Sequence, residues 1–401
     1  MSDLAEPTTV ESAEADVLER CRKLLADHPP ADTTTVEFLG AQYDAGLAWI
    51  HFPVGYGGLD ASPRLQAVVN HTLAAAGAPS AYLRNPIGYG MGAPTVLTHG
   101  SEEQKQRYLR PLFTGEEVWC QLFSEPGAGS DVAGLATKAE RDGDEWRFNG
   151  QKVWTTLAHL AKWGMLVART DPDQPKHKGL TYFVVDMEQP GVEVRPLRQM
   201  TGEAEFNEVY FTDATTPDSE RLGEVGEGWR VSLTTLMNER VSIGGTVPEK
   251  GSGPISVAVK AYKESKIAGA VERDELMQLW TRAEVHRLTN IRASQNRKAG
   301  VPGPEGSVGK MESANLNMDL YAFTMNLLGP EGMTYGSYDL DQPDTAMGFS
   351  YPQKAFLRSR ANSIEGGTTE VMKNILGERV LGLPGDVRVD KDKAWTEVPR
   401  N

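Results

Sequence analysis

The chain has 401 residues, of which 39% are hydrophobic and 24% are charged, so it holds enough apolar material for several cores. This composition excludes a mainly disordered chain. Lysine and arginine number 41 against 55 aspartates and glutamates, which gives a formal net charge of −14. Because such an acidic surface repels phosphate backbones, we expect no nucleic-acid partner.

Cysteine and histidine patterns give no sign of a metal site. Cys21 and Cys120 belong to no CxxC pair, and the seven histidines show no HExxH spacing. The N-terminus, MSDLAEPTTVESAEADVLER, is acidic and lacks the apolar run of a secretory signal. No stretch of 18 apolar residues indicates a membrane span. We therefore expect a cytoplasmic protein without a metal or a transmembrane helix.

Helical patterns dominate residues 1–118. Apolar residues recur at helical spacing from Glu14 to Leu25 and again from Arg64 to Ala76. Ser101 is followed by two glutamates, which is typical of a helix N-cap with an acidic first turn. These patterns predict a helical N-terminal domain.

The pattern changes to short strands over residues 119–225 and returns to helices over 226–401. The central part contains the β-branched and aromatic runs WRFNGQKVWTT, KWGMLVART, GLTYFVVDM, GVEVRPL and NEVYFTD, separated by turn signals. These runs predict a small β-barrel or sandwich. Long periodic segments with short connections then predict an antiparallel helix bundle. The expected fold class is α+β with three domains in that order.

The first motif that could bind a ligand is SEPGAGSD, Ser124 to Asp131. Its glycines allow close backbone approach and can direct N–H groups at a ligand. An ordinary turn with a helix cap is the favoured interpretation of such a loop on its own. The motif differs from a Rossmann fingerprint because GxGxxG and a βαβ context are absent.

The second motif is NGQKVWTT, Asn149 to Thr156, a turn signal followed by a strand-like run. The Trp154 indole can cover one face of a flat heteroaromatic cofactor, and Thr156 can hydrogen-bond its edge. The alternative is a strand with a core tryptophan, since tryptophan is highly buried on average.

These motifs occur in order with PVGYGG, HGSEEQKQRYLRPLFTGE, GLTYFVVD and EGGTTEVMKNILGERVLGLP. Together they resemble the FAD-dependent acyl-CoA dehydrogenase family over nearly the whole chain. The resemblance implies an N-terminal helical domain, a central β-barrel and a C-terminal four-helix bundle. By position, the residues implied to bind FAD are Gln121, Phe123, Ser124, Gly129, Ser130, Trp154, Thr155, Thr156, Thr368 and Glu370. Those implied to contact an acyl-CoA substrate are Ser130, Asn238, Arg240 and Gly366.

The implied reaction needs a carboxylate base for the α-proton of the thioester, and an apolar cleft strengthens such a base by raising its pKa. In many family members this glutamate lies in a segment resembling YEGT. Here the segment is IEGGTTE, so Gly366 occupies the position and Glu365 comes one residue early. A minority, resembling isovaleryl-CoA dehydrogenases, places the base on a bundle helix before an arginine. The matching segment, LMNERVSIGG, predicts Glu239 as the base. A solvated or ion-paired helix glutamate is the alternative.

Two family segments depart from the usual pattern. The region of the RxQFG segment reads KESKIAGAVERDELMQLW, and the QxLGG segment reads NLLGPEG. A loop, VPEKGSGP, also intrudes after Gly245. These changes resemble an actinobacterial-type branch, some of whose members act in steroid side-chain degradation and some of which form α₂β₂ heterotetramers. The resemblance implies a homo- or hetero-oligomer with an electron-transfer flavoprotein as acceptor. Two alternatives stay open: a subunit that completes a partner's flavin site, and a flavin oxidase or monooxygenase.

Overall fold

The computed structural model describes residues 10–244, 247–298, 303–344, 351–385, 387, 390 and 392–399. The chain forms two compact units. The first unit comprises residues 1–126, 135–195 and 207–235, and the second unit comprises residues 127–134, 196–206 and 236–401. Both units contain segments from more than one part of the sequence, so the predicted boundaries at residues 118 and 225 stay predictions.

The first unit begins with helices, and the three predicted ones are α1 (Val10–Asp27), α3 (Gln66–Ala75) and α6 (Glu102–Thr114). Three further helices, α2 (Thr35–Asp44), α4 (Ala81–Arg84) and α5 (Ala93–His99), lie between them. Ser101 caps α6 as predicted, because its hydroxyl accepts the Gln104 N–H while the Gln104 side chain bonds back to the Ser101 N–H. Gly115, in left-handed backbone with φ of 69°, ends this helix.

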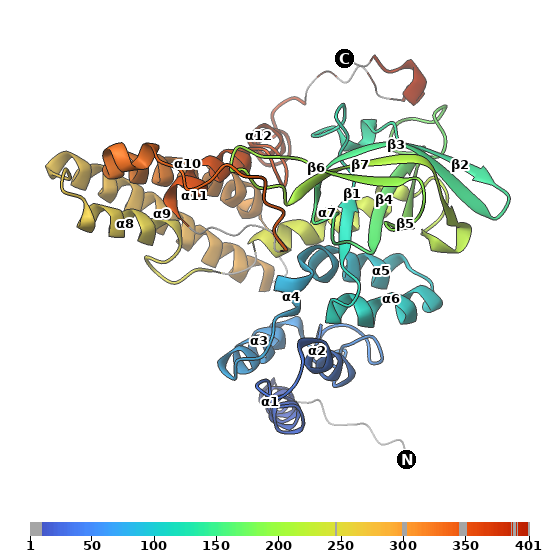
Figure 1. The fold of residues 1–401 in the computed structure, drawn as a ribbon, viewed down its shortest axis with the longest axis horizontal. Helices are drawn as coiled ribbons and strands as arrows, with labels where there is room; N and C mark the ends of the chain where they lie inside the picture. Colours follow the sequence, from blue (N-terminus) through green and yellow to red (C-terminus); the bar gives the residue numbers. More distant parts are fainter. Residues whose placement is uncertain are drawn as a thin grey trace. The chain divides into compact units, whose positions relative to one another are not determined.

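The central part of the chain forms the predicted β-structure, an eight-stranded sheet within the described residues (Figure 1). Its order is β6-β7-β3-β2-β4-β5-β8, and β1 pairs in parallel with β4. The core beneath it holds aromatic side chains such as Phe148 and Phe183, whose ring centroids lie 5.0 Å apart. The strands are β1 (Trp119–Leu122), β2 (Lys138–Asp142), β3 (Glu145–Thr156), β4 (Trp163–Arg169), β5 (Leu180–Asp186), β6 (Val192–Pro196), β7 (Phe206–Pro217) and β8 (Arg221–Leu222).

The C-terminal part is helical, with α7 (Gly228–Gly244), α8 (Pro254–Glu264), α9 (Ala270–Lys298), α10 (Glu305–Leu328), α11 (Pro352–Ser359) and α12 (Thr369–Ile375). Helices α8, α9 and α10 of the second unit pack side by side (Figure 1). Their shared core includes Ile255, Leu279 and Phe323. The predicted fold class, with helices before and after a central sheet, is confirmed.

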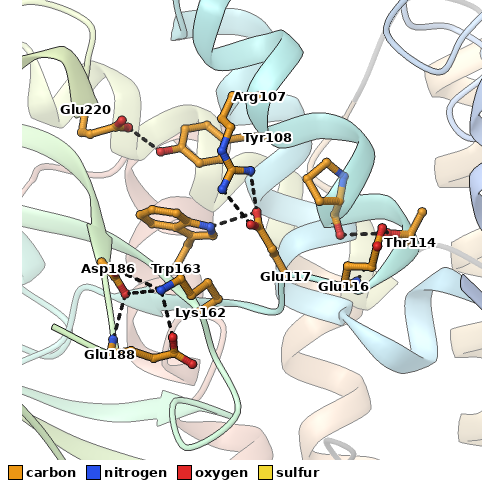
Figure 2. Close-up of polar contacts among 11 residues, drawn as sticks. Arg107, Tyr108, Thr114, Glu116, Glu117, Lys162, Trp163, Asp186, Glu188 and Glu220 are labelled. Carbon is orange, nitrogen blue, oxygen red and sulfur yellow. Dashed lines mark hydrogen bonds and ion pairs between the residues drawn. The ribbon is translucent and has the colours of Figure 1, made fainter.

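A polar network attaches α6 to the sheet near the start of β1. Glu117 accepts two hydrogen bonds from Arg107, at 2.9 and 2.7 Å, and a third from the Trp163 indole on β4, at 3.0 Å (Figure 2). Lys162, beside Trp163, is paired with Asp186 at 2.9 Å. These contacts fix the point at which the chain enters β1, the strand that leads into the first predicted motif.

Candidate functional site

Strand β1 is held in place by a buried asparagine. The Asn85 amide accepts the Trp119 N–H at 3.1 Å and donates to the Leu112 and Glu117 carbonyls at 2.9 and 3.2 Å. The parallel register with β4 then leaves Gln121 half-buried near the end of β1. Asn85 therefore fixes the strand that carries Gln121 and leads directly to Phe123, both of which are predicted cofactor residues.

The structure brings the two predicted motifs together. The Val153 N–H donates to the Ser124 carbonyl at 2.9 Å, and the Lys152 ammonium donates to the Phe123 carbonyl at 3.0 Å. Phe123 itself is buried edge-on against Tyr182, with ring centroids 5.8 Å apart. The end of β1 and the end of β3 thus form one hydrogen-bonded edge within the first unit.

A buried ion pair supports this edge. The Lys152 ammonium lies 2.8 Å from a carboxylate oxygen of Glu125, and the two side chains are 0% and 8% exposed. Glu125 also accepts the backbone N–H groups of Ala136 and Thr137, at 2.6 and 2.9 Å. Sequence reasoning did not single out this pair, although both residues lie inside the two quoted motifs.

The electrostatics of the pair favour the charged carboxylate. Burial acts to raise the pKa of Glu125, but Lys152 and the hydrogen bonds from Thr137 and Ala136 outweigh it and hold that pKa below its usual range. Burial lowers the pKa of Lys152, while Glu125 opposes that shift. The ion pair therefore joins three segments of the chain: the glycine-rich loop at Glu125, the backbone at Ala136 and Thr137, and β3 at Lys152.

Trp154 follows this ion pair and is left 56% exposed, with a left-handed backbone φ of 61°. A large aromatic side chain is seldom this exposed to solvent. The positive φ of Trp154 interrupts the regular alternation of side chains along β3. The next residue, Thr155, is buried, and its hydroxyl has no hydrogen-bond partner in the described structure. Thr156 is half-buried. An open indole beside a buried hydroxyl that lacks a partner fits a flat, polar-edged group such as the implied flavin.

The glycine-rich loop continues into the second unit. A Cβ placed on Gly129 would meet no atom within 4 Å, and Gly129 and Ser130 are both exposed. The end of the loop is held by the Trp395 indole, which donates to the Gly134 carbonyl at 3.0 Å. The exposed backbone agrees with the predicted role of a loop that a ligand can approach closely.

The predicted base, Glu239, lies half-buried on α7 with its neighbour Asn238, in the part of this helix that belongs to the second unit. Arg240 is in the same helix, but its side chain lies outside the described residues. Whether these residues and the Trp154 edge of the first unit form one site stays a prediction.

Glu365, the glutamate that comes one residue early, is engaged elsewhere. Its carboxylate accepts two hydrogen bonds from the buried Arg358, at 3.1 and 2.8 Å, and one from the Asn362 amide at 2.8 Å. Gly366 follows with a left-handed φ of 63°. The Glu365 carboxylate is thus occupied by Arg358 and Asn362, so Glu365 is a poor candidate for proton removal.

The predicted C-terminal cofactor residues begin α12. Thr368 is the N-cap of this helix, and its hydroxyl accepts the Val371 N–H at 3.1 Å. Glu370 lies exposed in the first turn. The capping role explains Thr368 locally without a cofactor, so its contact with FAD stays a prediction.

Neither a metal centre nor a membrane helix is found in the part of the chain that the structure describes. No three or more His, Cys, Asp or Glu side chains of these residues gather as metal ligands. None of the described helices combines the length and the apolar character that crossing a bilayer requires.

Comparison with known proteins gives matches along almost the whole chain. Three family models match in order: the acyl-CoA dehydrogenase N-terminal domain at residues 8–116, the middle domain at 120–214 and the C-terminal domain at 226–381. They confirm the family resemblance read from the motifs.

Individual relatives belong to the same family as the matching models. The acyl-CoA dehydrogenase FadE34 of Mycobacterium tuberculosis is 40% identical over 85% of this chain, which spans 45% of that protein's length. The acyl-CoA dehydrogenase IpdE1 of the same organism is 37% identical over 86% of each chain. Among solved structures, the ChsE4-ChsE5 complex from Mycobacterium tuberculosis has a similar fold, with a TM-score of 0.68, 24% identity, and coverage of 96% of this chain and 100% of that one.

Proposed function

Because the chain belongs to the acyl-CoA dehydrogenase family, we propose that it converts an acyl-CoA thioester to the trans-2-enoyl-CoA, with Glu239 as the base that removes the α-proton. The family consists of FAD-dependent oxidoreductases, and the predicted enzyme class and cofactor agree with this membership. FAD, when bound, supplies the acceptor for the β-hydride.

The observation that carries the proposal is the edge formed by Ser124 and Trp154. The two motifs that carry the resemblance are hydrogen-bonded to one another, and they present an exposed indole beside the buried Thr155 hydroxyl. We assign the cofactor to this edge, with Gln121, Phe123 and Thr156 around it. Gly129 and Ser130 on the glycine-rich loop, and Thr368 and Glu370 at α12, are proposed as its further contacts.

Support for Glu239 comes from two features of the second unit. Gly366 has no side chain at the position where many relatives carry the base, and Glu365 is held by Arg358. Glu239 is half-buried on α7. We place Asn238, Arg240, Ser130 and Gly366 along the bound thioester.

We also propose that the enzyme works as an oligomer and passes electrons to an electron-transfer flavoprotein. The similar fold of a two-component complex supports a heteromeric assembly. The missing QFG sequence agrees with it, since a partner could then supply cofactor contacts that this chain lacks.

The test is dye reduction by the purified holoenzyme with a panel of acyl-CoA thioesters, alone and with co-expressed neighbouring subunits. We expect the purified protein to be yellow, to bleach when substrate is added without dye, and to release the 2-enoyl-CoA. A colourless protein that gains activity only with a partner would instead favour the partner-subunit alternative. Prompt reoxidation of the bleached protein by air would favour an oxidase.

A further inference from the structure

The described part of the second unit contains a cavity of about 400 Å³ beside the segment that holds Gly366. It lies beside the start of α8 at Pro254. The first turn of α8, the middle of α10 and the end of α11 form its walls. This volume lies within the range of small-molecule pockets, so it can hold a substantial part of a ligand.

One wall of the cavity carries a polar group that lacks a partner. Tyr321 on α10 is only 8% exposed, and its hydroxyl makes no hydrogen bond to any described residue. Burial raises the pKa of this phenol, so it stays neutral and can donate its proton. The hydroxyl is not fully closed off from solvent, so it can reach a ligand in the cavity, where an oxygen acceptor would take the place of water.

The other walls select for a neutral, mainly apolar ligand. Pro254, Val257 and Ala355 supply apolar surface, and no charged side chain lines the cavity among the described residues. The Asn317 amide also lines it and donates to the Asn362 Oδ1 at 3.3 Å. An ionised ligand would lack a counter-charge in these walls, whereas a ketone or ether oxygen needs only a donor.

The cavity is physically connected to the segment of the proposed reaction. Asn362 forms part of its wall, and its side-chain amide donates to Glu365, the residue before Gly366, at 2.8 Å. Lys310 on α10 donates to the Asn362 carbonyl at 2.9 Å. A ligand in the cavity therefore lies against the same hydrogen-bonded segment that we place along the thioester.

We propose that this cavity binds the distal part of a bulky acyl group that carries a neutral oxygen acceptor, and that the Tyr321 hydroxyl donates to that oxygen. The proposal rests on the proposed function and gives it a substrate class: an oxygenated acyl-CoA rather than a plain hydrocarbon one. Tyr321 is a specificity residue and takes no part in proton removal.

The test compares two 2-enoyl-CoA products of identical carbon skeleton, one with a distal ketone and one with a methylene in its place. Their Kd values for the holoenzyme are measured by calorimetry, which requires no turnover, and the ketone is moved along the skeleton in a short series. For the best ketone position, Tyr321→Phe is expected to weaken binding about five- to tenfold while leaving the hydrocarbon product unchanged.

Tyr262→Phe is the matched control, because it removes another tyrosine hydroxyl from the same helical part, one bonded to Gly269 at 3.4 Å. It is expected to change neither Kd. Equal loss of both products in Tyr321→Phe, or no loss of either, overturns the proposal. Dye reduction measured in parallel tests the dehydrogenase function separately, so failure of one is distinguishable from failure of the other.

Discussion

Lys152 and Glu125 form an ion pair closed off from solvent, 2.8 Å apart, directly beneath the backbone that joins the two cofactor motifs. Lys152 donates to the Phe123 carbonyl as well, and the next residue, Val153, binds the Ser124 carbonyl. The pair therefore couples the end of β1 to the end of β3. Its loss would disturb both stability and the proposed cofactor edge.

Lys152→Met is expected to destabilise the protein by about 3–5 kcal/mol, because the substitution leaves the Glu125 carboxylate buried without its counter-charge. Chemical unfolding of the purified variant measures this. The matched control is Lys162→Met, which breaks a partly exposed pair with Asp186 and should cost only about 0–1 kcal/mol. Similar losses in the two variants would contradict the structural role of the buried pair.

Acid should lower the free energy of unfolding partly through protonation of Glu125. The folded-state pKa of this carboxyl is lowered, so its contribution to stability is fully present above the pKa of the unfolded chain, near 4.5. The contribution is lost as the pH falls from there through the folded-state pKa. Unfolding curves between pH 7 and pH 3 should show wild type and Glu125→Gln converging on the acid side. A gap that stays constant over this range would exclude Glu125 as the titrating group.

Glu239→Gln should keep FAD but lower kcat about 10²–10⁴-fold, the usual contribution of a general base. Stopped-flow bleaching of the flavin measures this step directly. Glu275→Gln, an exposed glutamate on α9, is the control and should retain full rate.

Glu365→Gln distinguishes the two candidate carboxylates. This change weakens the contact with Arg358 and should lower stability, yet leave bleaching far faster than in Glu239→Gln. If Glu365→Gln were the slower variant, the base would have to be reassigned.

Trp154→Ala should weaken FAD binding to the apoprotein about three- to tenfold, since an aromatic contact contributes roughly 0.5–1.5 kcal/mol. The side chain is largely exposed, so the melting temperature should change little. Fluorescence titration of apoprotein with FAD gives the affinity. Leu160→Ala removes another exposed apolar side chain nearby in sequence and should leave FAD affinity unchanged. Equal affinities for wild type and Trp154→Ala would remove Trp154 from the proposed site.

Sequence alone was sufficient where the determining contacts are local. Ser101 and Gln104 lie three residues apart, so a capping box can be predicted from their spacing, and alternating β-branched runs predict strands for the same reason. The motifs around Ser124 and Trp154 could also indicate the family, because each motif is a single unbroken run of residues. The absence of a glutamate at Gly366 is also local, because the segment IEGGTTE shows it directly.

Tertiary structure decided which of these residues meet. Lys152 reaches Glu125 across 27 positions, and Tyr321 comes to share a cavity with Pro254 and Asn362. Glu365 is turned to Arg358 by packing that no periodicity predicts. Such contacts depend on how separate elements pack, and the same side chains at the same spacing could equally face solvent. The family could therefore be predicted from the chain, whereas the buried ion pair beneath the two motifs and the cavity beside Tyr321 arise only in the folded protein.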